Sequence, residues 1–533
     1  MSLPHRLSAF FSGLAIAAMA SVPTTLGAGD RSAALTPAPV SVDAAAQAGG
    51  IGTGGDADAG TWQMLVLTDV AQIPVPAPST TTAVDYQSEL SALKSAQSRL
   101  TTEQRKAITY WSKGGVMRWT EILLELVADS DLPPAPNPDG SYPAPDANNP
   151  FADPRFPFAN PPYAARAYSY VTVAQYEALK VAWHYKYLYN RPAPTAVDRG
   201  VRALLPAKTI PAYPSEEAVL SGVTAEMMKL LFPTAIERIT MKAGEQRQAA
   251  LLSGRATQSD IAAGLAIGQA VAQIMIARAG ADGMRTAGGT PAQWKELENG
   301  AIARGEIPWK SQDIPPRPPM LPFFGRVRTW AMTAEDIVRE RPGPPPSTSS
   351  DLMEREKAEV KRAVGSATRE HIGIAQKWAD GASSPTPPGH WMFIAMPHIA
   401  RAQWSEVRIA RAFALIGMTV HDAAVACWEV KYFYFNPRPT QLDPEIKTVV
   451  GLPNFPAYTS GHSTFSAAAA TVLSYLFPQS TASFEADAAE AAISRLYGGI
   501  HFRSDIDVGL EHGRKVGGYT VRLAQSDGAD KGR

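Results

Sequence analysis

The stretch RIARAFALIGMTVHDAAVACWEVKYFYF, residues 408–435, decides the fold class of this 533-residue chain. Its apolar residues recur at helical spacing, and Trp428 and Lys431 stand three apart, on one helix face. Pro437 and Pro439 follow closely, and proline ends a helix. Similar segments rich in Ala, Leu, Glu and Gln occur from Tyr86 onward, while the alternation typical of strands is scarce. The sequence therefore predicts an all-α protein.

Much of the chain repeats itself at a constant shift of 245 residues. No gap is needed between about residues 166 and 268, and chance similarity of two helical segments would not keep one register for so long. We therefore predict two homologous bundles of the four-helix type, derived from an internal duplication. The matching pairs are Arg166-Ala167 with Arg411-Ala412, Trp183 with Trp428, Lys186 with Lys431, PAYPS 211–215 with PAYTS 456–460, Leu231-Phe232-Pro233 with Leu476-Phe477-Pro478, and Ser259-Asp260-Ile261 with Ser504-Asp505-Ile506.

The first residues have the layout of a secretory signal peptide. His5 and Arg6 precede an apolar run to Ala20, and small residues follow. A disordered or membrane-anchoring N-terminus is the alternative. No other run reaches the roughly 18–20 apolar residues that a membrane span needs, so we expect no stable membrane insertion. The protein is expected to be exported, either periplasmic or secreted.

Changes in composition divide the chain further. The segment GGIGTGGDADAG, residues 49–60, resembles a flexible linker, and proline-rich stretches interrupt the helical pattern. The expected division is a signal peptide at 1–28, a flexible lead-in at 29–60, an N-terminal bundle at 61–290, a Pro-rich connection at 291–350 and a C-terminal bundle at 351–533.

The overall charge excludes some classes of partner. Lys plus Arg equals Asp plus Glu, at 50 each, so no global field attracts nucleic acid or an anionic membrane. Cys427 is the only cysteine, which excludes disulfides within the chain. The functional charges must therefore be local.

Three segments of the C-terminal bundle carry such a local set of charges: KYFYFNPRP at 431–439, FPAYTSGH at 455–462 and ISRLYGGIHFRSD at 493–505. Spaced Lys and Arg residues neutralise an oxyanion, Arg clamps its oxygens in bidentate fashion, and a hydroxyl and backbone N–H complete the site. Two histidines remain for chemistry. The candidate residues are Lys431, Arg438, Ser460, Gly461, His462, Arg495 and His501, with Asp505 four residues after His501 on the same predicted last helix, where it can orient the ring.

The N-terminal bundle differs where this chemistry is expected. Only Lys186 and Ser215 survive there, while carboxylates and alanines replace the other groups, so that bundle is predicted to be structural. The replacements are Ala193 for Arg438, Glu216 for Gly461, Glu217 for His462, Ala250 for Arg495 and Ala256 for His501.

The full pattern, Lys-x6-Arg-Pro, then Ser-Gly-His, then Ser-Arg-x5-His-x3-Asp, resembles the superfamily that joins vanadium-dependent haloperoxidases with type 2 phosphatidic acid phosphatases and bacterial acid phosphatases. This resemblance implies two four-helix bundles with the active site in the second. It also implies vanadate as cofactor, with neither haem nor flavin. The resemblance implies that His501 bonds vanadium, that His462 is the acid and base, and that the vanadate oxygens are held by Lys431, Arg438, Ser460, Gly461 and Arg495.

The resemblance further implies the partners: hydrogen peroxide, a halide (bromide or chloride) and a small organic acceptor. Trp428 and Phe455 match the positions that form the halide-side wall in chloroperoxidase-type members, although both could equally belong to the core. Thr459 stands where the family usually has proline, and the interval from His462 to Arg495 is shorter than in fungal chloroperoxidases. Halide preference and oligomeric state therefore stay open.

Two alternatives share these residues. A soluble exported acid phosphatase would use His501 as nucleophile, form a phosphohistidine, and protonate the leaving group through His462. A non-catalytic phosphate-binding protein would use the same cations without turnover. Asp422, nine residues before Lys431, could pair with an active-site Arg or have a structural role.

Overall fold

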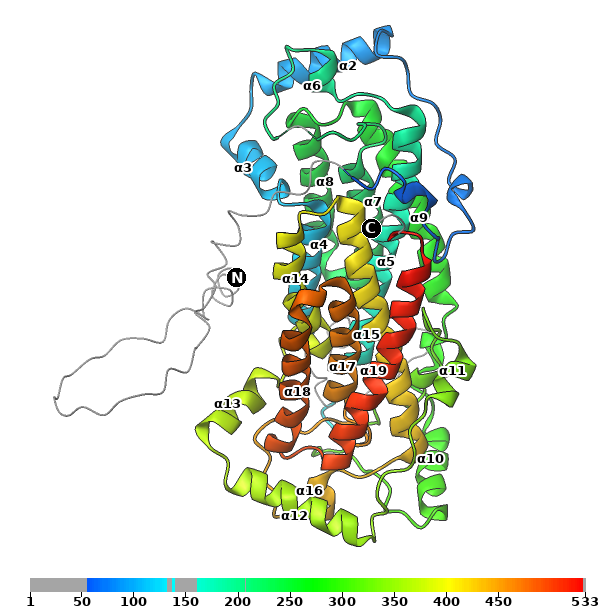
Figure 1. Cartoon of the computed structure of the whole chain (residues 1–533), viewed down its shortest axis with the longest axis vertical. Coiled ribbons are helices and arrows are strands. Elements are labelled where there is room, and N and C mark those ends of the chain that lie inside the picture. The colour runs from blue at the N-terminus through cyan, green and yellow to red at the C-terminus, as the bar shows by residue number, and fades with distance from the viewer. Residues whose placement is uncertain (1–54, 132–136, 140–160, 207, 531–533) are drawn as a thin grey trace, which may run out of the picture. The chain divides into compact units, whose positions relative to one another are not determined.

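The computed structural model describes residues 55–131, 137–139, 161–206 and 208–530. All regular secondary structure in these residues is helical, which confirms the all-α prediction (Figure 1). The predicted signal peptide and most of the lead-in lie outside the described residues, so export stays a prediction. The α-helices are α2 (Val84–Gln97), α3 (Thr102–Trp111), α4 (Gly115–Ser130), α5 (Pro161–Tyr189), α6 (Pro194–Val197), α7 (Glu216–Leu231), α8 (Ile236–Leu252), α9 (Gln258–Gly280), α10 (Pro291–Ala303), α11 (Ala334–Arg339), α12 (Asp351–Gly365), α13 (Arg369–Lys377), α14 (Thr386–Ala402), α15 (Glu406–Tyr434), α16 (Pro439–Leu442), α17 (Gly461–Leu476), α18 (Thr481–Tyr497) and α19 (Arg503–Ser526).

The predicted duplication is confirmed by the helix boundaries. Helices α5 to α9 begin ahead of their counterparts α15 to α19 by the same constant shift that relates the two sequence copies. The packing repeats as well, because α7 lies against α5, α8 and α9, while α17 lies against α15, α18 and α19. Figure 1 shows α15, α17, α18 and α19 running side by side as the C-terminal bundle.

The repeat also extends upstream, at a different and larger shift that the sequence comparison missed. Helices α2 and α12 begin at Val84 and Asp351, and α3 and α13 begin at Thr102 and Arg369, so the interval is the same for both pairs. The change of shift falls between α3 and α5, where the N-terminal bundle has the longer connection. A single constant offset therefore could not align this half of each copy.

The two bundles meet along their central helices, α5 and α15, which pack against each other. Both helices are buried over almost their whole length. At the crossing, a Cβ on Gly417 would lie 2.5 Å from Oγ1 of Thr172 and 3.1 Å from Cα of Ser169, so only glycine fits there. The deepest part of the core thus lies between the two copies.

Equivalent carboxylates on these central helices each anchor a non-helical segment that lies upstream in the sequence. Glu177 of α5 accepts hydrogen bonds from the backbone N–H groups of residues 65–67, each at 3.0 Å. Asp422, its counterpart on α15, accepts from Trp330 at 2.9 Å and Ala331 at 2.8 Å. Buried N–H groups need such acceptors, so Asp422 has the structural role. It does not pair with an active-site arginine.

The expectation that no further run reaches the length of a membrane span is wrong. Two segments, Gln258–Thr286 and Glu406–Leu442, are long and apolar enough by length and composition. In the second, every residue of the apolar window is buried inside the protein, and in the first 44% are. These are α9 and the core helix α15, and burial in a protein interior selects the same composition.

The stretch that separates the two bundles is more ordered than its prolines suggested. It contains α10 and α11, both of which begin with a threonine capping box, at Thr290 and Thr333. Between them, the carbonyl of Met320 accepts hydrogen bonds from the indole of Trp428 and the hydroxyl of Tyr432. This connection therefore packs directly on α15.

Replacing Asp422 with Ala should destabilise the fold. The change leaves two N–H groups of the segment at 330–331 without their acceptor, and each orphaned group costs roughly 1–3 kcal/mol, so we expect a loss of about 2–6 kcal/mol in the free energy of unfolding. Urea denaturation measures it. Glu445→Ala is the control, since its carboxylate is 77% exposed. Equal stability of the two variants would contradict the anchoring role.

Candidate active site

The candidate residues come together at one end of the C-terminal bundle, where α15 and α18 end and α17 and α19 begin. Lys431 lies in the last turn of α15, and Arg438 is the residue that precedes α16. Ser460 caps α17, with Gly461 and His462 as its first two residues. Arg495 lies in the last turn of α18.

His501 is placed differently from the sequence expectation. It was predicted to share the last helix with Asp505, but α19 begins only at Arg503, so His501 lies in the preceding loop. The expected contact nevertheless forms, with Nδ1 of His501 2.9 Å from Oδ2 of Asp505. The same oxygen accepts the N–H of Phe502 at 3.0 Å, as a carboxylate in the first turn of a helix can.

The three cations Lys431, Arg438 and Arg495, here called the cation cluster, are buried and have no carboxylate partner among the described residues. Their exposed fractions are 0%, 0% and 1%. No ion pair within the described residues involves any of the three, and backbone carbonyls hold them instead. Lys431 donates to Pro456, Ala457 and Thr459, Arg438 to Phe455 and Ile500, and Arg495 to Ala375.

Burial makes these charges costly. It lowers the pKa of Lys431 to about 7, that of Arg438 to about 9 and that of Arg495 to about 10. Unpaired buried charges are among the most expensive features of a protein interior. A bound anion would offset that cost. One nitrogen of Arg438, Nη2, is also buried without a hydrogen-bond partner.

His501 directs one unprotonated ring nitrogen toward the cation cluster. Because Asp505 accepts from Nδ1, the proton is assigned to Nδ1 and the lone pair to Nε2. Burial, reinforced by the neighbouring Arg438 and Lys431, lowers the pKa of His501 well below its ordinary value, so the ring is neutral. Its Nε2 lies 2.8 Å from Nη1 of Arg438, which donates to it.

His462 is a neutral base beside the cluster. Burial first, and then Arg495, lower its pKa well below the ordinary value. Its Nε2 is buried without a hydrogen bond, and the nearest carboxylate oxygen, Oδ2 of Asp380, is 3.9 Å away. Asp380 also lies 3.0 Å from Nδ1 of His390. Sequence reasoning missed both Asp380 and His390, because they precede the three motifs and share no spacing with them.

The start of α17 supplies neutral donors. The hydroxyl oxygen of Ser460 accepts from the N–H of Ser463 at 3.3 Å, which leaves its own proton free to donate. The N–H of Gly461 belongs to the first turn, where no intrahelical acceptor exists. A Cβ on Gly461 would meet Phe465 at 3.6 Å and Trp428 at 4.0 Å, which are ordinary van der Waals contacts, so no neighbour would clash with it.

Trp428 and Phe455 form an apolar wall next to the cluster. Their ring centroids are 4.8 Å apart, and the Phe455 ring lies 5.0 Å from both Nζ of Lys431 and Cζ of Arg438. The indole N–H of Trp428 donates to Met320 at 3.1 Å. The two residues therefore present carbon surfaces, not donors, to the site.

This donor set fits a small tetrahedral oxyanion. Three cations, a serine hydroxyl, a helix N-terminus and an unprotonated imidazole nitrogen converge, and an orphaned guanidinium N–H remains among them. Vanadate and phosphate are both such ions. The residues present therefore fit the vanadate that the sequence resemblance implies.

Oxyanion binding should weaken as pH rises through neutrality. Lys431 carries its charge only below its lowered pKa of about 7, and burial raises the pKa of Asp505 to about 7, so the site becomes less positive above that pH. Linkage then predicts about a tenfold loss of sulfate affinity between about pH 6 and about pH 8. Calorimetric titration with sulfate measures it, because the charge of sulfate is constant over this range. Affinity that is constant or rises would contradict the assignment.

The comparisons with known proteins agree with this geometry. Residues 408–527 match the family model of the PAP2 superfamily. The solved structure of a bacterial vanadium-dependent iodoperoxidase is similar at 22% identity and a TM-score of 0.56, over 76% of this chain and 96% of that one. A holo-type bacterial vanadium-dependent chloroperoxidase is similar at 14% identity and a TM-score of 0.50, over 74% and 96%. No curated protein matched the sequence. The C-terminal bundle thus resembles the PAP2 superfamily over residues 408–527, within a fold that the chain shares with bacterial vanadium-dependent haloperoxidases.

Proposed function

We propose that this protein is a vanadate-dependent haloperoxidase that oxidises bromide with hydrogen peroxide. The product is hypobromous acid or an equivalent, which halogenates a small organic acceptor. The observation that carries the proposal is the cation cluster, buried with no ion pair to a carboxylate of the described residues, beside a histidine whose Nε2 is assigned the lone pair. The double-bundle fold supports the haloperoxidase branch of the superfamily.

The cofactor would be held by residues already in place. Nε2 of His501 would bond vanadium, the cation cluster would neutralise the oxygens, and Ser460 and the N–H of Gly461 would donate to them. When bound, vanadate supplies a Lewis acid that activates peroxide toward halide without a change of oxidation state. Arg438 must turn one N–H away from Nε2 of His501 for this bond to form, since the two atoms are now 2.8 Å apart.

His462 would move the protons. Its ring is neutral, and its buried Nε2 has no hydrogen-bond partner, so it can accept a proton from hydrogen peroxide at that atom. The same nitrogen can then return the proton to the departing oxygen. The carboxylate of Asp380, whose Oδ2 lies 3.9 Å from this Nε2, would stabilise the imidazolium that forms.

The halide would lie against Trp428 and Phe455. Both rings are buried and offer only carbon surface, which keeps a bound halide poorly hydrated and therefore reactive. Such an apolar wall favours oxidation of bromide, and a closer fit of the two rings around the ion would extend it to chloride. The two solved structures above are described as an iodoperoxidase and a chloroperoxidase, so the fold is compatible with either preference in other proteins.

Two assays on purified apo-protein test the function. The first follows halogenation of monochlorodimedone with hydrogen peroxide and bromide, chloride or iodide, with and without orthovanadate. The second follows hydrolysis of p-nitrophenyl phosphate without vanadate. Vanadate-dependent bromination is expected. Turnover of iodide alone would remove the bromide and chloride claims, and phosphate hydrolysis that vanadate inhibits, without halogenation, would assign the protein to the phosphatase branch.

Two histidine variants should separate binding from catalysis. His462→Ala should keep vanadate binding and lose about 10²–10⁴-fold in kcat, the usual contribution of an acid–base group. His501→Ala should lose vanadate binding itself. Equilibrium dialysis of vanadate and steady-state kinetics measure the two effects, and circular dichroism confirms folding. Undiminished turnover by His462→Ala would contradict its role.

A further inference from the structure

A small pocket lies in the N-terminal bundle at the position equivalent to the active site. It holds about 30 Å³, room for roughly one water molecule. Ala193, Ala212, Glu216 and Glu217 line it, and their counterparts in the C-terminal bundle are Arg438, Ala457, Gly461 and His462. The backbone frame is the same in both copies. The N–H of Ser215 donates to the carbonyl of Asp260 at 3.0 Å, and the N–H of Ser460 donates to the carbonyl of Asp505 at 2.8 Å.

Three cations lie at this pocket, two of them in its lining and the third, Lys186, in contact with the lining residue Glu216. Lys186 is the direct counterpart of Lys431 and donates to Pro211 at 2.6 Å, as Lys431 donates to Pro456. Lys208 and Arg255 line the pocket, although their counterparts, Pro453 and Ile500, carry no charge. Sequence comparison at equivalent positions therefore showed only lost guanidinium groups, whereas the structure shows that other positions replace them.

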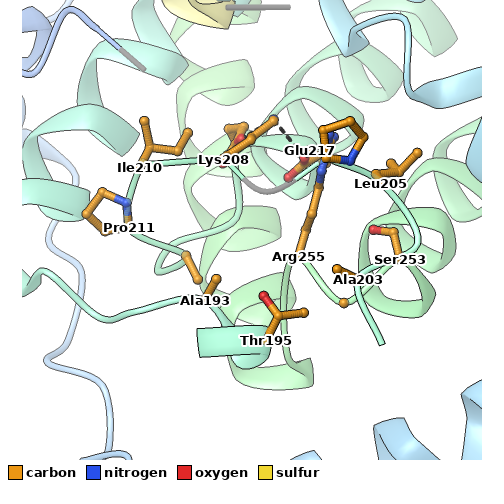
Figure 2. Close-up of a pocket in the computed structure, with 14 residues that line it drawn as sticks. Ala193, Thr195, Ala203, Leu205, Lys208, Ile210, Pro211, Glu217, Ser253 and Arg255 are labelled. Carbon is orange, nitrogen blue, oxygen red and sulfur yellow. Dashed lines mark hydrogen bonds and ion pairs between the residues drawn. The ribbon is translucent and has the colours of Figure 1, made fainter. Parts of the chain in front are cut away.

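The two sites differ in that the N-terminal one contains its own anions. Glu216 lies 2.7 Å from Nζ of Lys186 and also pairs with Lys208. Burial alone would raise its pKa, but these two lysines outweigh burial and hold the pKa of Glu216 well below its usual range. Glu217 lies 3.1 Å from Lys208 and 3.6 Å from Arg255, and Figure 2 shows these three side chains reaching toward one another.

We propose that the N-terminal bundle holds a second oxyanion-binding site, which the side chain of Glu216 keeps closed by occupying it. In the active site the corresponding residue is Gly461, which has no side chain and whose N–H lacks a helical acceptor. At the N-terminal site the Glu216 side chain takes that place and supplies the negative charge. The ligand class for the opened site is a small tetrahedral oxyanion such as sulfate or phosphate. The proposal stands on the charges of this pocket and does not depend on haloperoxidase activity.

Glu216→Gly tests the proposal in the full-length protein. Removing the side chain should open the pocket and leave Lys186, Lys208 and Arg255 facing the single carboxylate of Glu217. We expect the variant to bind one more equivalent of sulfate than the wild type in equilibrium dialysis, whatever number the wild type binds. Sulfate should also raise its melting temperature more than that of the wild type. Halogenation by the other bundle should be unchanged.

Glu216→Gln is the matched control, because it removes the charge but keeps the side chain in the pocket. It should be less stable than the wild type and should bind no additional sulfate. An extra equivalent in Glu216→Gln as well would show that charge alone, and not the space, closes the site, which would overturn the proposal as stated. Equal sulfate binding by Glu216→Gly and the wild type would overturn it too.

The reciprocal variant keeps the test decisive even if Glu216→Gly does not fold. Gly461→Glu should place a carboxylate beside Lys431, as Glu216 lies beside Lys186, and should abolish sulfate binding at the C-terminal bundle while the protein stays folded. Loss of one sulfate equivalent supports the plug mechanism. A folded Gly461→Glu variant that binds sulfate as well as the wild type would show that a carboxylate at this helix position does not close the site.

Discussion

The packing of α5 against α15 is the constraint on which the rest of the structure depends. These two helices occupy the centre of the described residues. Each carries, in its own bundle, the equivalent lysine, Lys186 or Lys431. Because they are buried along most of their length, every polar side chain on them must be satisfied internally. Arg166 pairs with Asp282, and the corresponding Arg411 pairs with Asp527, both at 2.7 Å. The polar contacts were thus duplicated together with the core.

A common frame for both sites follows from this arrangement. The lysine near the end of each central helix, Lys186 or Lys431, donates to carbonyl oxygens of the loop that follows. The serine that caps α7 or α17 donates its backbone N–H to the carbonyl of the aspartate in the first turn of α9 or α19. Divergence is confined to the side chains that enter the frame. A carboxylate at the first position of α7 gives a closed ion cluster, whereas glycine at the first position of α17 gives a site whose positive charge is unbalanced.

Much of this could be predicted from the sequence, for a physical reason. A duplication with a constant offset preserves helix boundaries, so comparison of the copies aligned the region that holds most of α5 to α9 with the one that holds most of α15 to α19, and it showed which bundle had kept the motifs. The sequence comparison missed the upstream helices, because their offset exceeds that of α5 to α9 by the length of the extra connection after α3. The sequence comparison also missed Asp380, Lys208 and Arg255, because charged residues that reach a site from non-equivalent loops leave no spacing pattern. The position of His501 in the loop before α19 was not predicted, because a four-residue spacing is equally compatible with a helix and with a loop that a capping carboxylate holds.

The acceptors that hold the cation cluster explain why the active site stays attractive to anions. Carboxylates would fix Lys431, Arg438 and Arg495 in place but would also cancel their charge, as Glu216 does for Lys186. Backbone carbonyls fix the same groups and leave the net charge intact, because a carbonyl is a dipole. The loop that presents several of them is itself anchored, with Ala457 bonded to Asn436 at 3.0 Å and Ser460 to Asp505 at 2.8 Å. The protein therefore bears the desolvation cost of three charges within its fold, and the ligand that neutralises them gains an equivalent part of its binding energy.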